Sequence, residues 1–305
     1  MGMQWQINWR GGTEELALTL QQQFEASLEL VEQQMSHWHD ASDLMRFNRA
    51  ASGWISLPTE LLFVLERARF IAQQSGACFN PCLGALVQLW GFGPGSRYRQ
   101  PDWQIPETAA IDAVRAACDW QALQIDLARQ SAWQPGGMQL DLSGIAKGYA
   151  VDLLAQQLEQ HEIRHYLVEF GGELRGAGVR ADQQPWWVEI EVPTRLGSKP
   201  ARQLLGLLGL AVASSGDDRQ YFEVQGQRYS HTLDGRSGYP IHNELVSVSV
   251  IHRSCMIADA WASALSVLGC QRGLLMAQQE QLAALFMTTQ GELHLSPALQ
   301  EMVHD

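Results

Sequence analysis

The chain lacks any segment that could cross a membrane as a helix. Its 305 residues contain no apolar run approaching the roughly 20 residues that a membrane-spanning helix requires. The longest apolar stretch, residues 204–213, is interrupted by Gly206 and Gly209 and is predicted to be a strand. The N-terminus has neither the basic nor the apolar region of a signal peptide, so a cytoplasmic protein is expected. A leader removed beforehand would instead imply a periplasmic protein.

Positive charge is also scarce. The chain has 21 lysines and arginines against 33 aspartates and glutamates, which gives a formal net charge of −12. Nucleic-acid binding depends on contacts between clustered basic side chains and phosphates, and no such cluster is present, so no nucleic-acid partner is expected. An acidic protein that handles phosphates needs local help from a metal ion, a lysine or backbone N–H groups.

Cysteine is sparse and follows no pattern. Five scattered cysteines in a long chain do not indicate a disulfide framework. Cys78 and Cys82 are close together, but no second Cys/His pair follows, so a structural zinc site is not indicated. The phosphate-binding pattern G-x-x-x-x-G-K-[ST] and the nucleophile elbow G-x-S-x-G are absent as well. The second absence disfavours a hydrolase built from Ser143 or Ser214 with His231.

Helical and strand-like patterns are both present. Alternation over residues 3–9 predicts a strand, and helical spacing after Thr13 predicts an amphipathic helix capped by that threonine. Further helices are expected at about 59–74, 106–118, 145–161 and 256–269, and a strand at 138–142. Between them, hairpin patterns predict antiparallel meanders. Because the chain shows neither a βαβ rhythm nor a linker, we predict an α+β fold in one domain, residues 1–305.

The segment "DLSGIAKGYAVD" at residues 141–152 is the first candidate for chemistry. Gly144 and Gly148 permit close backbone approach, and Lys147 falls in the first turn of the predicted helix. A helix N-terminus attracts anions because its first N–H groups are unpaired and its dipole is positive there. The alternative is an ordinary turn into a helix in which Lys147 only contacts solvent.

The second candidate is "IADAWASALSVLG" at residues 257–269. Asp259 and Ser263 are four positions apart, so they share one face of the predicted helix. A carboxylate and a hydroxyl offer two hard oxygen ligands of the kind that Mg²⁺ takes together with water and phosphate. The alternative is a buried aspartate that hydrogen-bonds the serine.

Two further segments carry histidine and aromatic residues. In "YSHTLDGRSGYP", His231 falls at the end of a strand, where it either contacts a ligand or is an ordinary strand-end histidine. In "GACFNPCLGALVQLWGFGP", Phe79, Trp90 and Phe92 would wall a flat pocket. Aromatic side chains are more often part of a core, and this is expected at least for Trp90.

Taken together and in order, these motifs resemble those of the ApbE family of FAD:protein FMN transferases. The matching segments are 1–3, 35–38, 79–84 with 89–92, 141–150, 171–173, 215–216, 231–238 and 258–264. The resemblance implies a T-fold-like α+β fold with mixed, largely antiparallel sheets and packed helices. It also allows two lobes with the FAD site between them. The implied activity is transfer of FMN from FAD to a threonine hydroxyl of a target flavoprotein, with release of AMP.

The resemblance also assigns roles to individual residues. The metal, Mg²⁺, would be held by Asp259, the Ser263 hydroxyl and the Ala150 carbonyl, with Ala262 adjoining. The residues expected to contact FAD are Met1, Trp38, Cys78, Phe79, Asn80, Lys147, Leu153, His231 and Leu233. Either His231 or Asp259 would take the proton of the target threonine, and the sequence does not choose between them.

The chain departs from the family pattern at several positions. Asn80 replaces an aspartate, Cys82 and Ser263 each replace a threonine, Gly235 replaces a proline, and Met3 replaces a threonine. Two other functions therefore stay open, an FAD-binding or flavin-storage protein with little chemistry and an FAD pyrophosphatase that releases FMN and AMP. The expected partners are FAD and an acceptor flavoprotein, and the chain is a monomer or a homodimer.

Overall fold

The structure is a computed structural model that describes residues 3–190, 192, 196, 203–216 and 220–304. The chain divides into two compact units. Unit 1 comprises Met1–Val31, Gly144–Gly216 and Glu244–Asp305, and unit 2 comprises Glu32–Ser143 and Asp217–Asn243. Each unit combines segments that are far apart in the sequence. A division of this kind leaves no linker to be seen along the chain.

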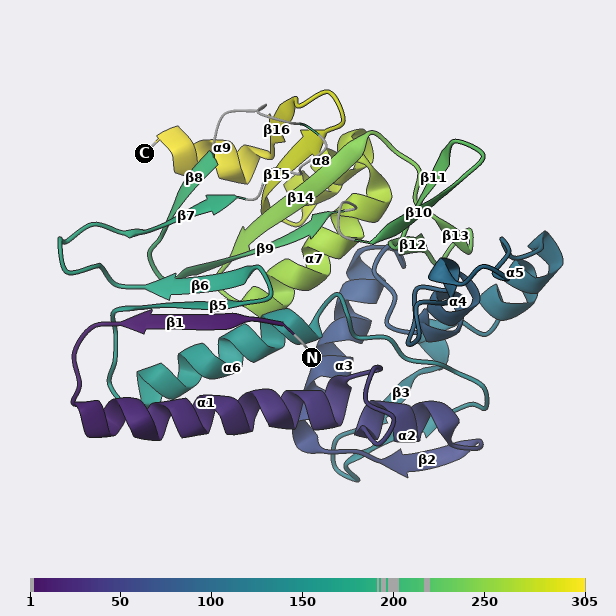
Figure 1. Cartoon of the computed structure of the whole chain (residues 1–305), viewed down its shortest axis with the longest axis horizontal. Helices are drawn as coiled ribbons and strands as arrows, with labels where there is room; N and C mark the ends of the chain where they lie inside the picture. Colours follow the sequence, from purple (N-terminus) through teal and green to yellow (C-terminus); the bar gives the residue numbers. More distant parts are fainter. Residues whose placement is uncertain (1–2, 191, 193–195, 197–202, 217–219, 305) are drawn as a thin grey trace. The chain divides into compact units, whose positions relative to one another are not determined.

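Unit 1 is built on a seven-stranded sheet in the order β1-β5-β6-β9-β14-β15-β16 (Figure 1). Its strands are β1 (Trp5–Trp9), β5 (Tyr166–Phe170), β6 (Glu173–Ala177), β9 (Leu210–Gly216), β14 (Leu245–His252), β15 (Ala283–Thr288) and β16 (Leu293–Leu295). Each neighbouring pair in this sheet is antiparallel, which confirms the predicted α+β class. A separate antiparallel pair is formed by β7 (Trp186–Ile190) and β8 (Gln203–Leu207).

Helices α6 (Ala146–Gln160) and α7 (Cys255–Leu268) pack on this sheet and on each other. Helix α6 contacts β5 and β6, whereas α7 contacts β9 and β14 (Figure 1). Helix α7 is apolar nearly all round, which is typical of a helix buried on more than one side. The other helices of this unit are α1 (Glu14–Met35), which continues into unit 2, α8 (Cys270–Gln279) and α9 (Pro297–His304).

Unit 2 combines short helices with small sheets. Its helices are α2 (Asp43–Arg49), α3 (Thr59–Gln74), α4 (Gly84–Leu89) and α5 (Thr108–Arg115), with 3-10 turns at Arg97–Arg99 and Trp120–Ala122. Its strands are β2 (Gly53–Ser56), β3 (Gln124–Asp126), β4 (Ser131–Gln134), β10 (Tyr221–Val224), β11 (Gln227–Ser230), β12 (Leu233–Asp234) and β13 (Tyr239–Pro240). Trp90, Phe92, Phe222 and Leu233 belong to one buried cluster, so the expected core role of Trp90 is confirmed.

The predicted strand at residues 138–142 is wrong. The Leu140 N–H donates to Asn48 Oδ1 at 2.7 Å, and Asn48 Nδ2 donates to the Leu140 carbonyl at 2.9 Å. A buried side chain thus pairs with the backbone in place of a neighbouring strand. The single strand expected at 204–213 is also wrong, because Gly209, with φ +74°, separates β8 from β9. Helices α2, α4, α8 and α9 and strand β16 were not predicted.

Two expectations about what the chain lacks hold in the structure. None of the helices in the described part of the chain has both the length and the apolarity that crossing a bilayer takes. All five cysteines are buried, and none forms a disulfide, as their irregular spacing suggested.

Candidate functional site

The predicted metal ligands lie on two helices of unit 1. Asp259 and Ser263 are one turn apart on α7, and Asp259 is buried with 4% of its surface exposed. Ala150 is fully buried in α6, and Ala262 adjoins Ser263 on α7. Asp259 Oδ2 accepts the backbone N–H of Gly148 at 3.1 Å. Among the described side chains Asp259 makes no hydrogen bond to Ser263, so the structure does not support the simple Asp–Ser pair.

Lys147, in the first turn of α6, is held by two buried carboxylates. Its Nζ pairs with Glu173 Oε1 and lies 3.8 Å from Asp259 Oδ1. Glu173, at the start of β6, is only 2% exposed. Lys147 is therefore not a purely solvent-facing residue. Glu173 belongs to the matched segment 171–173, but the sequence indicated no role for it, although an acidic residue directly after two glycines and before a core strand was a visible signal.

The charges of this cluster follow from burial and pairing. Burial lowers the pKa of Lys147, but the carboxylates of Asp259 and Glu173 outweigh it and leave the pKa raised. Burial raises the pKa of Asp259, and Lys147 and the Gly148 N–H oppose this. The ammonium of Lys147 is thus positively charged at neutral pH and is paired with two buried carboxylates.

Gly148 brings α6 and α7 into unusually close contact. A Cβ atom at this position would lie 2.4 Å from the Cys255 carbonyl oxygen and 2.7 Å from Met256 Cα. Both atoms belong to the backbone of α7, so no side-chain movement relieves the overlap. The close approach expected of Gly148 is confirmed, and it is what allows its N–H to reach Asp259.

The donor set on these two helices fits Mg²⁺. It consists of a carboxylate on Asp259, a hydroxyl on Ser263 and a main-chain carbonyl at Ala150, all hard oxygen donors. The described residues contain no group of three or more His, Cys, Asp or Glu side chains placed to hold a metal. Mg²⁺ commonly uses one or two carboxylates and completes its shell with water and substrate phosphate, whereas zinc prefers nitrogen and sulfur ligands.

The predicted flavin contacts outside unit 1 lie in several different environments. Trp38 is 49% exposed, and its ring centroid lies 5.1 Å from that of His37. Cys78, Phe79 and Asn80 are buried, and Leu233 lies in the aromatic core. Met1 lies outside the described residues, and Leu153, also assigned to the flavin, is half-buried on α6.

His231 directly follows β11 and has a defined tautomer. Its Nδ1 lies 3.0 Å from the Gln220 carbonyl oxygen. Because a carbonyl only accepts hydrogen bonds, Nδ1 must carry the proton, and the neutral ring then presents Nε2 as an acceptor. The serines considered for a hydrolase have other partners, since Ser214 bonds Ser249 at 2.7 Å and Ser143 lies 3.3 Å from His37.

A family model described as the ApbE family matches residues 1–286. The chain belongs to the ApbE family. It is 38% identical over 270 residues to the FAD:protein FMN transferase of Vibrio cholerae, a match that covers 88% of this chain and 79% of the relative. It is 36% identical to that of Salmonella typhimurium, over 96% of this chain and 83% of the relative.

Solved structures of ApbE proteins agree with the fold. The flavinyl transferase ApbE of Pseudomonas stutzeri, in its apo form, superposes with a TM-score of 0.87 at 35% identity, over 97% of this chain and 92% of that one. The apbe protein of Thermotoga maritima has a TM-score of 0.84 at 24% identity, which shows the shared fold alone.

Three departures from the ApbE pattern are neighbours in unit 2. Asn80 Oδ1 accepts the Cys82 N–H at 2.8 Å, and Asn80 Nδ2 donates to the Cys118 carbonyl at 2.9 Å. A Cβ at Gly235 would lie 3.1 Å from Asn80 Nδ2 and 2.7 Å from Leu83 Cδ2. The glycine therefore makes room for the asparagine and the leucine. Asn80, Cys82 and Gly235 therefore belong to one connected group of contacts.

Proposed function

We propose that this chain transfers FMN from FAD to a threonine hydroxyl of an acceptor flavoprotein, with Mg²⁺ as cofactor. The observation that carries the proposal is the buried cluster of Asp259, Lys147 and Glu173, with Ser263 on the same helix face as Asp259. Relatives of this ApbE chain are named FAD:protein FMN transferases, which identifies FAD as the flavin donor and a protein as the acceptor.

Residues of unit 1 would bind the metal and the phosphates. Asp259, the Ser263 hydroxyl and the Ala150 carbonyl would hold Mg²⁺, which when bound neutralises charge on the pyrophosphate and on the transition state. Lys147 would contact a phosphate oxygen, and Glu173 fixes its ammonium through their ion pair. Trp38, whose ring is exposed, would stack on the flavin or on the adenine of FAD.

The reaction is a phosphoryl transfer with a simple balance. The threonine oxygen forms a bond to the phosphorus of the FMN moiety, and the bond from that phosphorus to the bridging oxygen of AMP breaks. AMP leaves with the bridging oxygen, and the hydroxyl proton passes to a base. Catalysis of this kind depends mainly on positioning and charge neutralisation rather than on a covalent enzyme intermediate.

We assign the base to His231 rather than to Asp259. With Nδ1 donating to the Gln220 carbonyl, Nε2 is the ring nitrogen of the neutral imidazole that can accept a proton. The carboxylate of Asp259 accepts from Gly148 and faces Lys147, and a bound metal would take its remaining lone pairs. Asp259 is therefore assigned to the metal alone.

The test follows AMP and covalent flavin in the same reaction. The protein is incubated with FAD, MgCl₂ and an acceptor flavoprotein domain that carries the target threonine. We expect one AMP for each fluorescent acceptor on a denaturing gel. Asp259→Asn should abolish both products, whereas Asp102→Asn, a matched change at an exposed aspartate, should leave both unchanged. Equal labelling by wild type and Asp259→Asn would refute the metal assignment.

The same assay separates the two other functions. Free FMN and AMP without an acceptor would identify a pyrophosphatase. FAD binding without AMP release in the presence of Mg²⁺ would identify a flavin-storage protein. His231→Gln removes the basic nitrogen and should lower the transfer rate by about 100- to 10,000-fold, the usual contribution of a general base. A full rate in that variant would exclude His231 as the base.

A further inference from the structure

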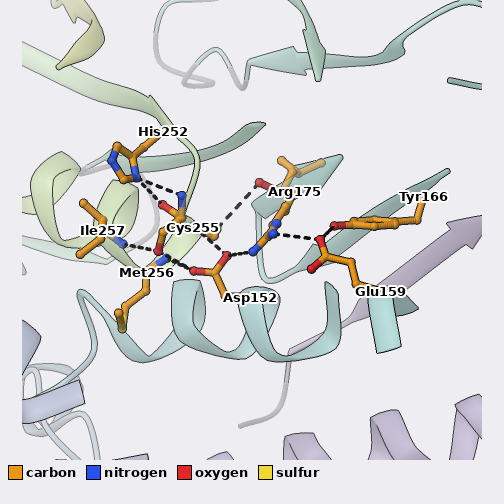
Figure 2. Close-up of polar contacts among 10 residues, drawn as sticks. Asp152, Glu159, Tyr166, Arg175, His252, Cys255, Met256 and Ile257 are labelled. Atoms are coloured by element: carbon orange, nitrogen blue, oxygen red, sulfur yellow. Dashed lines mark hydrogen bonds and ion pairs between the residues drawn. The ribbon is translucent and has the colours of Figure 1, made fainter. Parts of the chain in front are cut away.

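A network of polar side chains joins α6 to the first turn of α7 (Figure 2). The Asp152 carboxylate, on α6, accepts four hydrogen bonds. Its Oδ1 accepts from the Cys255 N–H at 3.0 Å and from Arg175 Nη1 at 2.8 Å. Its Oδ2 accepts from Ser254 Oγ at 2.6 Å and from the Met256 N–H at 3.0 Å. Three of the four donors belong to the start of α7.

This arrangement caps α7 from a neighbouring helix. The first N–H groups of a helix have no partner within the helix, and a negative charge near them is favourable. Ser254 is the N-cap, and its Oγ accepts the Ile257 N–H while donating to Asp152. Asp152 satisfies the N–H groups of Cys255 and Met256 directly. The start of α7 is thus fixed to one residue of α6.

Arg175 holds Asp152 in place from the sheet. Arg175 lies on β6, and its Nη2 donates to Glu159 Oε1 at 3.0 Å while Nη1 reaches Asp152. The same Glu159 oxygen accepts the hydroxyl of Tyr166, a fully buried residue of β5 (Figure 2). The Arg175 guanidinium therefore connects Asp152 and Glu159 of α6 with strand β6. The sequence indicated no role for Asp152 or Arg175.

The network lies next to the proposed metal ligands in both helices. Asp152 is two residues after Ala150, and the capped turn at Cys255 begins the same helix that carries Asp259. Mg²⁺ requires near-octahedral ligands at about 2.0–2.1 Å, so ligands on two helices demand a fixed offset between those helices. The Gly148 contact sets how closely α6 and α7 approach, and the Asp152 cap sets their offset along the helix axes.

We propose that Asp152 and Arg175 are positioning residues that hold α6 and α7 in the register that Mg²⁺ binding needs. The inference rests on the proposed function, since it concerns the same metal. It predicts that metal affinity depends on two side chains that do not touch the metal.

Asp152→Asn is the sharpest variant because it keeps the size of the side chain. A carboxamide offers one acceptor oxygen and an NH₂ group, so two of the four donors would face another donor. We expect the Mg²⁺ dissociation constant of the FAD-free protein to rise about 10- to 100-fold, as when a partner of a metal ligand is lost. Asp182→Asn is the matched control, at an exposed aspartate 3.9 Å from Arg180.

Arg175→Met leaves the three contacts between Asp152 and α7 in place and should weaken Mg²⁺ binding less. Arg180→Met is its surface control. The affinity is measured by titration calorimetry with MgCl₂, beside melting temperature and the Mg²⁺ dependence of transfer. High Mg²⁺ should restore the transfer rate of Asp152→Asn while its KM for FAD stays near wild type. A merely structural role would lower the melting temperature without changing the Mg²⁺ dissociation constant or the Mg²⁺ dependence of transfer.

The outcomes distinguish the inference from the proposed function. If both variants melt early but bind Mg²⁺ as wild type does, the inference fails and the function stands. If Asp152→Asn does not fold, unchanged Mg²⁺ affinity in Arg175→Met overturns the inference. Weakened Mg²⁺ binding in a protein whose wild type transfers no flavin would support the inference and refute the function. A wild type that binds no Mg²⁺ either without or with FAD would refute both.

Discussion

Replacing Gly148 by alanine tests the closest contact in the candidate site. The added Cβ would lie 2.4 Å from the carbonyl oxygen and 2.6 Å from the carbonyl carbon of Cys255. Overpacking of this kind costs about 1–3 kcal/mol, and because the overlap is with backbone we expect the upper end. Alanine returns about 1 kcal/mol as the better helix former. The net loss is then about 2 kcal/mol, which lowers the melting temperature of a large domain by about 4–8 °C.

A second helical glycine provides the comparison. At Gly273 in α8 a Cβ would lie 2.6 Å from the ring atom Phe286 Cε1, which is the end of a side chain rather than backbone. Gly273→Ala gains the same helix propensity, and the nearest backbone atom to its Cβ, the Leu265 carbonyl oxygen, is 3.3 Å away rather than 2.4 Å, so it should cost less than Gly148→Ala. Calorimetric melting of both variants decides the question. A Gly148→Ala protein that melts at or above the wild-type temperature would refute the close helix contact.

Three further predictions concern charge, space and thiols. The folded-state pKa of Lys147 is raised above its ordinary value of 10.5, so its contribution to stability is complete below pH 10.5 and is lost as pH rises through the folded value. The free energy of unfolding, measured with urea, should therefore fall more steeply from about pH 9 to 12 for wild type than for Lys147→Met. An equal pH dependence in the two proteins would contradict the buried ion pair. Gly235→Ala should lower the free energy of unfolding in urea by about 1–3 kcal/mol, and by less in a Leu83→Ala background. An equal loss in both backgrounds would exclude a clash between the added Cβ and Leu83. All five cysteines are buried, and burial raises the pKa of Cys118 to about 11, so a thiol reagent at neutral pH should react slowly with the native protein and with five thiols after denaturation. Rapid reaction of the native protein would contradict this burial.

Local patterns predicted the longer helices but not α2, α4, α8 and α9. The helix after Thr13 is α1, and the Leu16 N–H donates to the Thr13 hydroxyl at 3.2 Å, as the predicted cap requires. The helix expected at 59–74 is α3, Thr59–Gln74. Such predictions succeed because capping and apolar spacing depend on residues only a few positions apart. The strand expected at 138–142 failed because Asn48, far away in the sequence, supplies the backbone partners of Leu140.

The sequence by itself determined the family resemblance, the helix that carries Asp259 and Ser263 on one face, and the helix that begins beside Lys147. Only the tertiary structure placed Glu173 against Lys147 and Asp152 against the start of α7. Each of these pairs joins residues from different elements, so their separation in the sequence does not predict the contact. A buried charge requires an oppositely charged or hydrogen-bonding group beside it, and the packing of the elements determines which group that is. The segment "LDLSGIAKGYAVD" thus identifies Lys147 as a candidate residue, but only the fold shows that Glu173 and Asp259 are its partners.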